Sequence, residues 1–141
     1  MTQIDTAAEF TAGQQACSRE VGPIGLTDVV RYQGASHDFN PVHHDQELAG
    51  SAGFPSPIIP GMMAMGFLGD LLVDTFGLEN LLAFDAKFVS VMFLGDRLRC
   101  GAVVKTIEGA SPPVLILSVT CETERGPTIQ GTARVRIPSD H

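Results

Sequence analysis

The chain has 141 residues, of which 44% are hydrophobic, so it is long enough for one domain with a substantial core. Its formal net charge of −7, with nine Lys and Arg residues, argues against a nucleic-acid-binding protein, because such domains carry a basic face. Cys17, Cys100 and Cys121 are widely spaced and odd in number, which excludes a disulfide framework or a zinc ribbon and indicates free thiols in a reducing compartment.

The N-terminal region gives no signal for export or membrane insertion. Residues 1–16 are polar and lack the basic start and apolar core of a secretory signal. No apolar run approaches the roughly 20 residues of a membrane span. We therefore expect a soluble, cytoplasmic, single domain over residues 1–141, with about residues 1–12 disordered and without a membrane partner.

The first predicted elements are a turn and two short helices separated by a proline. Residues 22–25 predict a turn, after which Thr27 is a candidate N-cap for a helix that runs to about residue 34. Asn40 precedes a proline, and the residue before proline disfavours helix, so the chain should break there. A second helix is expected over residues 41–49, with Asn40 as its candidate N-cap.

A shaped loop and one strongly apolar helix come next. Residues 51–60 contain three prolines and predict an extended loop. The segment Met62–Phe76 predicts the strongest helix of the chain, and Pro60 and Gly61 mark its start. Its apolar residues surround the helix on almost every side, which indicates a buried helix.

The C-terminal half shows the alternation of apolar and polar residues that is typical of strands with one wet face. The predicted strands cover residues 84–93, 97–105, 114–123 and 133–137, with turns at residues 109–113 and 126–127. Strands that follow a buried helix predict an α+β fold in which an antiparallel sheet packs around that helix.

Acid–base groups gather at the proline break. Asp38 lies just before the break and His43 just after it, so their side chains can converge on one small volume and act on a water molecule. Histidine suits this role because imidazole ordinarily titrates near neutral pH. The alternative is an aspartate that caps the next helix and a solvated histidine. Asn40 either orients Asp38 or caps the helix, and both roles can hold together.

The same segment carries a longer motif, Asp38-Phe39-Asn40-Pro41-Val42-His43, within residues 32–45. It resembles the signature of the MaoC-like dehydratases, a family that includes the (R)-specific enoyl-CoA hydratases. Further matches follow in the family's order at Ala49, Ala52-Gly53-Phe54, Ile58-Ile59-Pro60-Gly61-Met62, Phe88 and Gly95-Asp96. Together they cover the chain from about residue 26 to residue 98.

The resemblance implies a hotdog fold, with an antiparallel sheet wrapped around a long central helix, and a hydratase or dehydratase that needs no cofactor. Asp38 and His43 would hold a water molecule. One would take its proton as oxygen adds to C3 of a trans-2-enoyl thioester, and the other would deliver a proton to C2. The substrate would be an enoyl-CoA or an acyl-carrier thioester. A homodimer or a hotdog heterodimer is implied, and the apolar composition fits either buried subunit contacts or a well-filled core.

The start of the apolar helix is the second expected functional element. The Gly61 amide has no partner within the helix and lies at the positive end of the helix dipole, so it can bind the thioester oxygen. Gly61, Met62, Pro60 and Phe54 are the expected oxyanion and substrate-binding residues. Pro60 replaces a histidine found in many family members, a difference that leaves the Gly61 amide in place. The alternative is that Gly61 merely serves the turn.

Three other interpretations compete with this one. His37, His43, His44 and Asp45 could form a metal site, but the proline break should scatter these side chains, so we expect no metal and a surface position for His37 and His44. A hotdog acyl-CoA thioesterase would use the Gly61 amide without needing the set of Asp38, Asn40 and His43. The third is a non-catalytic subunit of a heteromeric hotdog assembly, but such a subunit should lose the pair of Asp38 and His43, which this chain keeps. In a heteromeric hotdog dehydratase this chain would therefore be the catalytic subunit.

Overall fold

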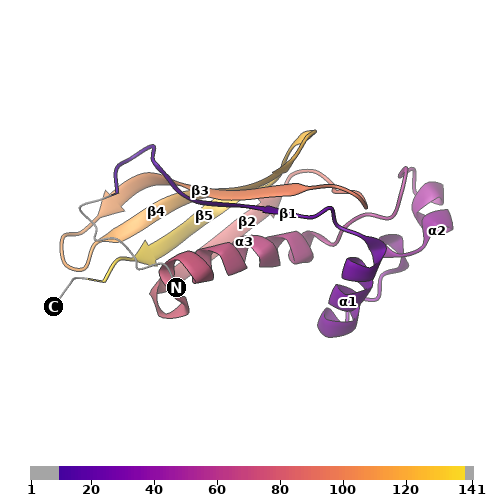
Figure 1. The fold of residues 1–141 in the computed structure, drawn as a ribbon, viewed down its shortest axis with the longest axis horizontal. Helices are drawn as coiled ribbons and strands as arrows, with labels where there is room; N and C mark the ends of the chain where they lie inside the picture. The colour runs from indigo at the N-terminus through magenta and orange to yellow at the C-terminus, as the bar shows by residue number, and fades with distance from the viewer. Residues whose placement is uncertain (1–9, 139–141) are drawn as a thin grey trace.

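The computed structural model describes residues 10–138, which form one five-stranded antiparallel sheet with a long helix packed along it (Figure 1). Most of the segment expected to be disordered, residues 1–9, lies outside the described residues. Phe10, the first described residue, packs against Phe76, and the centres of the two rings are 6.2 Å apart. Within residues 10–138, no helix combines the length and apolar character that crossing a bilayer requires.

The sheet has the strand order β1-β3-β4-β5-β2, and all neighbouring strands are antiparallel. The strands are β1 (Gln15–Val21), β2 (Leu81–Phe88), β3 (Leu98–Glu108), β4 (Val114–Thr123) and β5 (Gly126–Arg136). The α+β class is confirmed, and so are the predicted strands at β3 and β4. The strand predicted over residues 133–137 is only the end of β5, which begins at Gly126. β1 was not expected, because its alternation is weak and none of its residues is fully buried, as suits an edge strand.

Two details of the C-terminal half differ from expectation. The turn assigned to residues 126–127 lies at Glu124 and Arg125, and Gly126 already begins β5. Gly126 has a φ of 115°, a conformation that favours glycine, which explains why the sequence there looks like a turn. β2 covers residues 81–88 rather than 84–93, so it ends at Phe88.

The long helix α3 (Gly61–Phe76) provides the central apolar layer and confirms the expected buried helix. It lies along one face of the sheet in Figure 1, and Leu68, Leu72 and Phe76 are fully buried there. The facing side chains of the sheet include Cys100 and Cys121, which are opposite one another on β3 and β4. Both are buried free thiols, and their Sγ atoms are 3.6 Å apart.

The segment before α3 is built differently from the sheet. Helix α1 (Leu26–Ser36) begins after Gly25 rather than Thr27, because the carboxylate of Asp28 accepts a hydrogen bond from the Gly25 amide at 2.9 Å. α1 and the short helix α2 (Gln46–Ser51) lie beyond the end of the sheet, near the start of α3 (Figure 1).

The helix expected over residues 41–49 is divided in two. A 3₁₀ turn, η2, covers Pro41–His43, and α2 begins only after Asp45. The Asp45 carboxylate accepts hydrogen bonds from the amides of Glu47 and Leu48 at 2.9 and 3.0 Å, which requires non-helical backbone at Asp45. This N-cap interrupts the helix and leaves His43 on a tight turn rather than on a helical face.

Candidate active site

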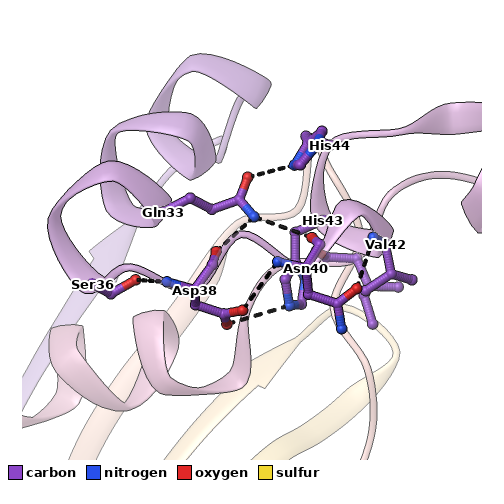
Figure 2. A network of polar contacts seen from close by, with 8 residues as sticks. Gln33, Ser36, Asp38, Asn40, Val42, His43 and His44 are labelled. Atoms are coloured by element: carbon purple, nitrogen blue, oxygen red, sulfur yellow. Dashed lines mark hydrogen bonds and ion pairs between the residues drawn. The ribbon is translucent and has the colours of Figure 1, made fainter.

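Asp38 and His43 face one another across the proline break, as Figure 2 shows. The Nε2 atom of His43 is 3.7 Å from Oδ2 of Asp38. The His43 side chain is 11% exposed and the Asp38 side chain is 45% exposed. The structure therefore brings the two expected acid–base groups together. The imidazole of His43 is largely buried, and the carboxylate of Asp38 is open to solvent.

The backbone of Ile58 determines which nitrogen of His43 is protonated. The Nδ1 atom of His43 lies 2.7 Å from the carbonyl oxygen of Ile58, which can only accept a hydrogen bond. Nδ1 must therefore carry a proton, and in the neutral ring Nε2 has a free lone pair. This lone pair is directed toward Asp38, so both groups present acceptors to the space beside them.

One water molecule fits between these acceptors. A separation of 3.7 Å is too long for a direct hydrogen bond between Nε2 of His43 and Oδ2 of Asp38. An oxygen atom at the usual hydrogen-bond distance of about 2.8 Å from each atom satisfies the triangle that they form. The two hydrogens of water match the two acceptors, so the geometry suits a water that is polarised from both sides.

Asn40 shapes the turn between the two groups. Its side-chain Oδ1 accepts a hydrogen bond from the Val42 amide at 3.1 Å, which confirms its expected role as an N-cap. Its backbone amide donates to Oδ1 of Asp38 at 3.3 Å. Asn40 thus contacts Asp38 through its backbone, and its side chain is engaged in the cap.

Gln33 is a site residue that sequence reasoning missed. It is 3% exposed, and its Nε2 donates to the carbonyl oxygens of Asp38 and Asn40 at 2.8 and 3.1 Å (Figure 2). Because Nε2 is the donor, Oε1 is the acceptor for Nδ1 of His44 at 2.8 Å. Gln33 and the buried Val29 are four residues apart on α1, and this spacing on one helical face is the signal that could have identified Gln33.

The start of α3 presents amide groups that have no acceptor within the helix. Within the described part of the chain, the structure gives the amides of Gly61 and Met62 no acceptor, as expected for a first helical turn. A Cβ atom at Gly61 would lie 3.0 Å from two ring carbons of Phe88. The absence of a side chain at position 61 therefore allows Phe88 to lie against the helix start.

The other expected substrate-binding residues differ in exposure. Met62 is 56% exposed, Pro60 is buried, and Phe54 is half-buried with its ring 6.3 Å from that of Phe93. A separate surface pocket of about 410 Å³ is lined by the end of β1, residues 22–24, α1 and α3. Its lining includes Met63 and Phe67 of α3, but it does not include Asp38, His43 or Gly61.

The four residues of the hypothetical metal site are not brought together. His37 and His44 are exposed, as expected; His37 ends α1 with a φ of 60°, and His44 is hydrogen-bonded to Gln33. Asp45 is engaged as the cap of α2. Among residues 10–138, no three His, Cys, Asp or Glu side chains are placed to share a metal ion.

Comparison with known proteins points to one family. The family model described as "MaoC like domain" matches residues 5–114. The chain is 27% identical over 136 residues to the (R)-specific enoyl-CoA hydratase of Aeromonas caviae, a match that covers 94% of this chain and 99% of the relative. It is 28% identical over 114 residues to a mitochondrial 3-hydroxyacyl-[acyl-carrier-protein] dehydratase of Solanum lycopersicum, covering 79% and 69% of the two chains.

The fold comparison agrees with the sequence comparison. The solved structure of the (R)-hydratase from A. caviae superposes with a TM-score of 0.81 at 26% identity, covering 94% of this chain and 100% of that one. This likeness confirms the expected hotdog fold, with α3 as its central helix.

Proposed function

This chain belongs to the MaoC-like domain family, and we propose that it is a hydro-lyase that adds water to a trans-2-enoyl thioester or removes it from an (R)-3-hydroxyacyl thioester. The observation that carries this proposal is the orientation of His43, whose Nδ1 is fixed on Ile58 so that Nε2 faces Asp38. The substrate class follows the relatives, which are named as enoyl-CoA hydratases and 3-hydroxyacyl dehydratases.

In the hydration direction, water lies between Asp38 and His43 and gives a proton to one of them as its oxygen bonds to C3. The electrons of the C2–C3 double bond move toward the thioester carbonyl. The proton that water gave up passes from the side chain that took it to the other member of the pair, which delivers it to C2. The reaction adds H and OH across the double bond. Both side chains are then in their starting protonation states.

We propose that the amides at the start of α3 stabilise the negative charge that develops on the thioester oxygen. The amides of Gly61 and Met62 lack acceptors within the described residues and lie at the positive end of the helix dipole. The side chains of Met62 and Phe54 would then contact the substrate near the carbonyl, and Pro60 would hold the turn. No residue here needs a bound cofactor for this chemistry.

Hydration of crotonyl-CoA, followed by loss of the enoyl absorbance, tests the reaction. Longer, branched and steroid-type enoyl-CoAs and the corresponding acyl-carrier thioesters define the acyl group and the carrier. A thiol reagent added to a parallel assay separates the thioesterase alternative, because hydrolysis releases free CoA and hydration does not. Release of thiol without loss of the double bond would contradict the hydratase assignment.

Two variants at the helix start test the carbonyl-binding role. Gly61→Val should reduce turnover strongly, because its side chain would displace the thioester carbonyl from the amide, and a lost oxyanion donor raises the barrier by roughly 3–4 kcal/mol. Pro60→His should be much milder, because it adds no side chain at position 61 and leaves the amide accessible. Phe88 complicates this test, since a side chain at 61 meets its ring. The double variant of Gly61→Ala with Phe88→Ala removes that clash. Its return to full activity would assign the loss to the ring contact instead of the carbonyl.

We propose that a second hotdog subunit covers the apolar surface beside Gly61. Met62, Phe88, Val89 and Val91 are 56%, 50%, 48% and 40% exposed, next to β2, which is an edge strand. We favour a second copy of this chain over a different subunit, and analytical ultracentrifugation at micromolar concentration tests this. A fully active species of a single chain's mass would contradict it. The cytoplasm remains our proposed compartment.

A further inference from the structure

The turn at residues 92–96 is held by one carboxylate. Oδ2 of Asp96 accepts a hydrogen bond from the Phe93 amide at 2.8 Å, which closes the turn. The guanidinium of Arg125 binds the same carboxylate through both of its oxygens, with Nη1 3.0 Å from Oδ1 and Nη2 on Oδ2. The Asp96 side chain is 12% exposed, so this two-point ion pair is partly shielded from water.

Arg125 reaches this turn from a distant part of the chain, the β4–β5 turn. Its guanidinium carbon is also 5.0 Å from the centre of the Phe93 ring, so it contacts the turn at two points. Burial alone would raise the pKa of Asp96, but the hydrogen bonds from Arg125 and the Phe93 amide hold it below the ordinary aspartate value. The carboxylate is therefore charged at neutral pH, as the ion pair requires.

The 92–96 turn supports the loop that carries Ile58. Ile59 donates its amide to the Met92 carbonyl at 2.8 Å, and Ile58 forms a β-bridge with Phe93. On its other side, Ile58 donates its amide to the Val42 carbonyl at 3.2 Å. The Ile58 carbonyl is thus fixed between the turn and η2.

Ile58 is also the partner of His43, so these contacts form a continuous path. The path runs from Arg125 through Asp96 and the 92–96 backbone to Ile58, and then to Nδ1 of His43 at 2.7 Å. Every link is a hydrogen bond, ion pair or backbone bridge. A shift of the turn would move the Ile58 carbonyl, and with it the atom that sets the orientation and tautomer of His43.

We propose that Asp96 and Arg125 are positioning residues that hold the His43 ring with Nε2 directed at the water site. This inference rests on the proposed function for its effect on rate, but its structural part concerns His43 alone. The two residues touch no reacting atom. They act by keeping the Ile58 carbonyl in place, and small displacements of a catalytic group cost on the order of 10²-fold in rate.

The test compares Arg125→Ala and Arg125→Lys with the control Arg99→Ala. Arg99 forms an exposed ion pair with Glu122 at 2.8 Å on the same sheet, so it controls for the loss of any surface arginine. Long-range ¹H–¹⁵N spectra of labelled histidine report the tautomer of His43, assigned by comparison with His43→Ala. Crotonyl-CoA hydration gives kcat and KM for the same samples, and circular dichroism checks folding.

In Arg125→Ala we expect the His43 spectrum to show exchange between tautomers and kcat to fall by about tenfold or more, with little change in KM. Arg125→Lys should lie between this variant and the wild type, because lysine cannot bind both carboxylate oxygens in one plane. An unchanged His43 spectrum in Arg125→Ala, or an equal loss of kcat in Arg99→Ala, would overturn the proposal.

The spectra also separate the two proposals from one another. A wild-type protein that does not hydrate any enoyl thioester contradicts the proposed function. The response of the His43 tautomer to Arg125→Ala would still decide whether the ion pair positions this ring.

Discussion

The sheet with α3 and the segment from Gly25 to Pro60 are stabilised by different means. In the sheet and α3, rows of fully buried aliphatic side chains such as Leu68 and Leu117 supply the stability. The segment before α3 contributes few buried apolar side chains, among them Val29 and Ala49. It is held chiefly by caps, by the amide of Gln33 and by the contact of His43 with Ile58.

This contrast indicates that one region supplies the stability of the domain and the other positions the catalytic side chains. Apolar burial is non-directional, so it stabilises the domain without fixing single atoms. Hydrogen bonds are directional, so they fix the orientation of Asp38 and His43 relative to one another while adding little net stability. Mutations in the sheet and α3 should therefore change mainly stability, and mutations in the segment from Gly25 to Pro60 should change mainly activity. The following substitutions test how far these two effects are separate.

The largest effect is expected from substitutions of Asp38 and His43, which should lower activity without lowering stability. Asp38→Asn and His43→Ala should each lower kcat by on the order of 10²-fold or more, the contribution of a general acid or base. The free energy of unfolding in urea should change little for Asp38→Asn, because that side chain is 45% exposed. A double variant that retains wild-type turnover would contradict the assignment of both residues.

The reverse result is expected in the sheet. Leu117→Ala removes a side chain that is 0% exposed and should lower the free energy of unfolding by about 2–5 kcal/mol. The activity per folded molecule should be unchanged, as measured by hydration at low temperature. Ser118→Ala, at an exposed neighbouring position, is the control. A loss of specific activity in Leu117→Ala would show that the two regions are coupled.

Gln33 should be the exception in which stability and activity fall together. Gln33→Met leaves the carbonyls of Asp38 and Asn40 without their donor, which should lower the unfolding free energy by about 1–3 kcal/mol. The turn that carries Asp38 would loosen, so kcat should fall as well. Gln33→Glu keeps the size and the acceptor for His44 but not the donors, and should behave similarly. Full activity in both variants would remove Gln33 from the site.

The smallest effect is expected at the cap of α2. Asp45→Ala deletes the acceptor for two amides and should cost about 1 kcal/mol of stability, whereas Asp45→Asn should cost less. Thermal unfolding monitored by circular dichroism measures both. Activity should change only slightly, because among residues 10–138 the Asp45 side chain caps α2 and forms no hydrogen bond or ion pair with Asp38 or His43. An activity loss as large as that of Gln33→Met would instead place α2 within the catalytic machinery.

Much of the sheet and α3 could be predicted from the sequence, because each element carries its own periodicity. The apolar run of α3 and the alternation in β4 repeat over many residues, so a few exceptions do not obscure them. β1 was missed because an edge strand needs no buried row. The split between η2 and α2 was missed because it depends on the side chain of one residue, Asp45.

The site could be predicted only in part. Asp38 and His43 lie close together in sequence on either side of a proline, so their convergence follows from local geometry. The contacts that support these two residues cannot be predicted from local geometry. Arg125 is 29 residues from Asp96, and nothing in the spacing of the two indicates that they meet. Gln33 resembles any polar residue of a helix until its burial is known.

The two facing cysteines of the sheet offer a built-in chemical probe of this architecture. Cys100 and Cys121 are 0% exposed, and their mutual hydrogen bond and burial raise the pKa of Cys100, so an alkylating reagent reaches them only when the core between the sheet and α3 opens. Residues 25–60 contain no cysteine. The labelling rate of these two thiols therefore reports opening of the core between the sheet and α3. Local unfolding of residues 25–60 alone does not change this rate, and no engineered label is needed.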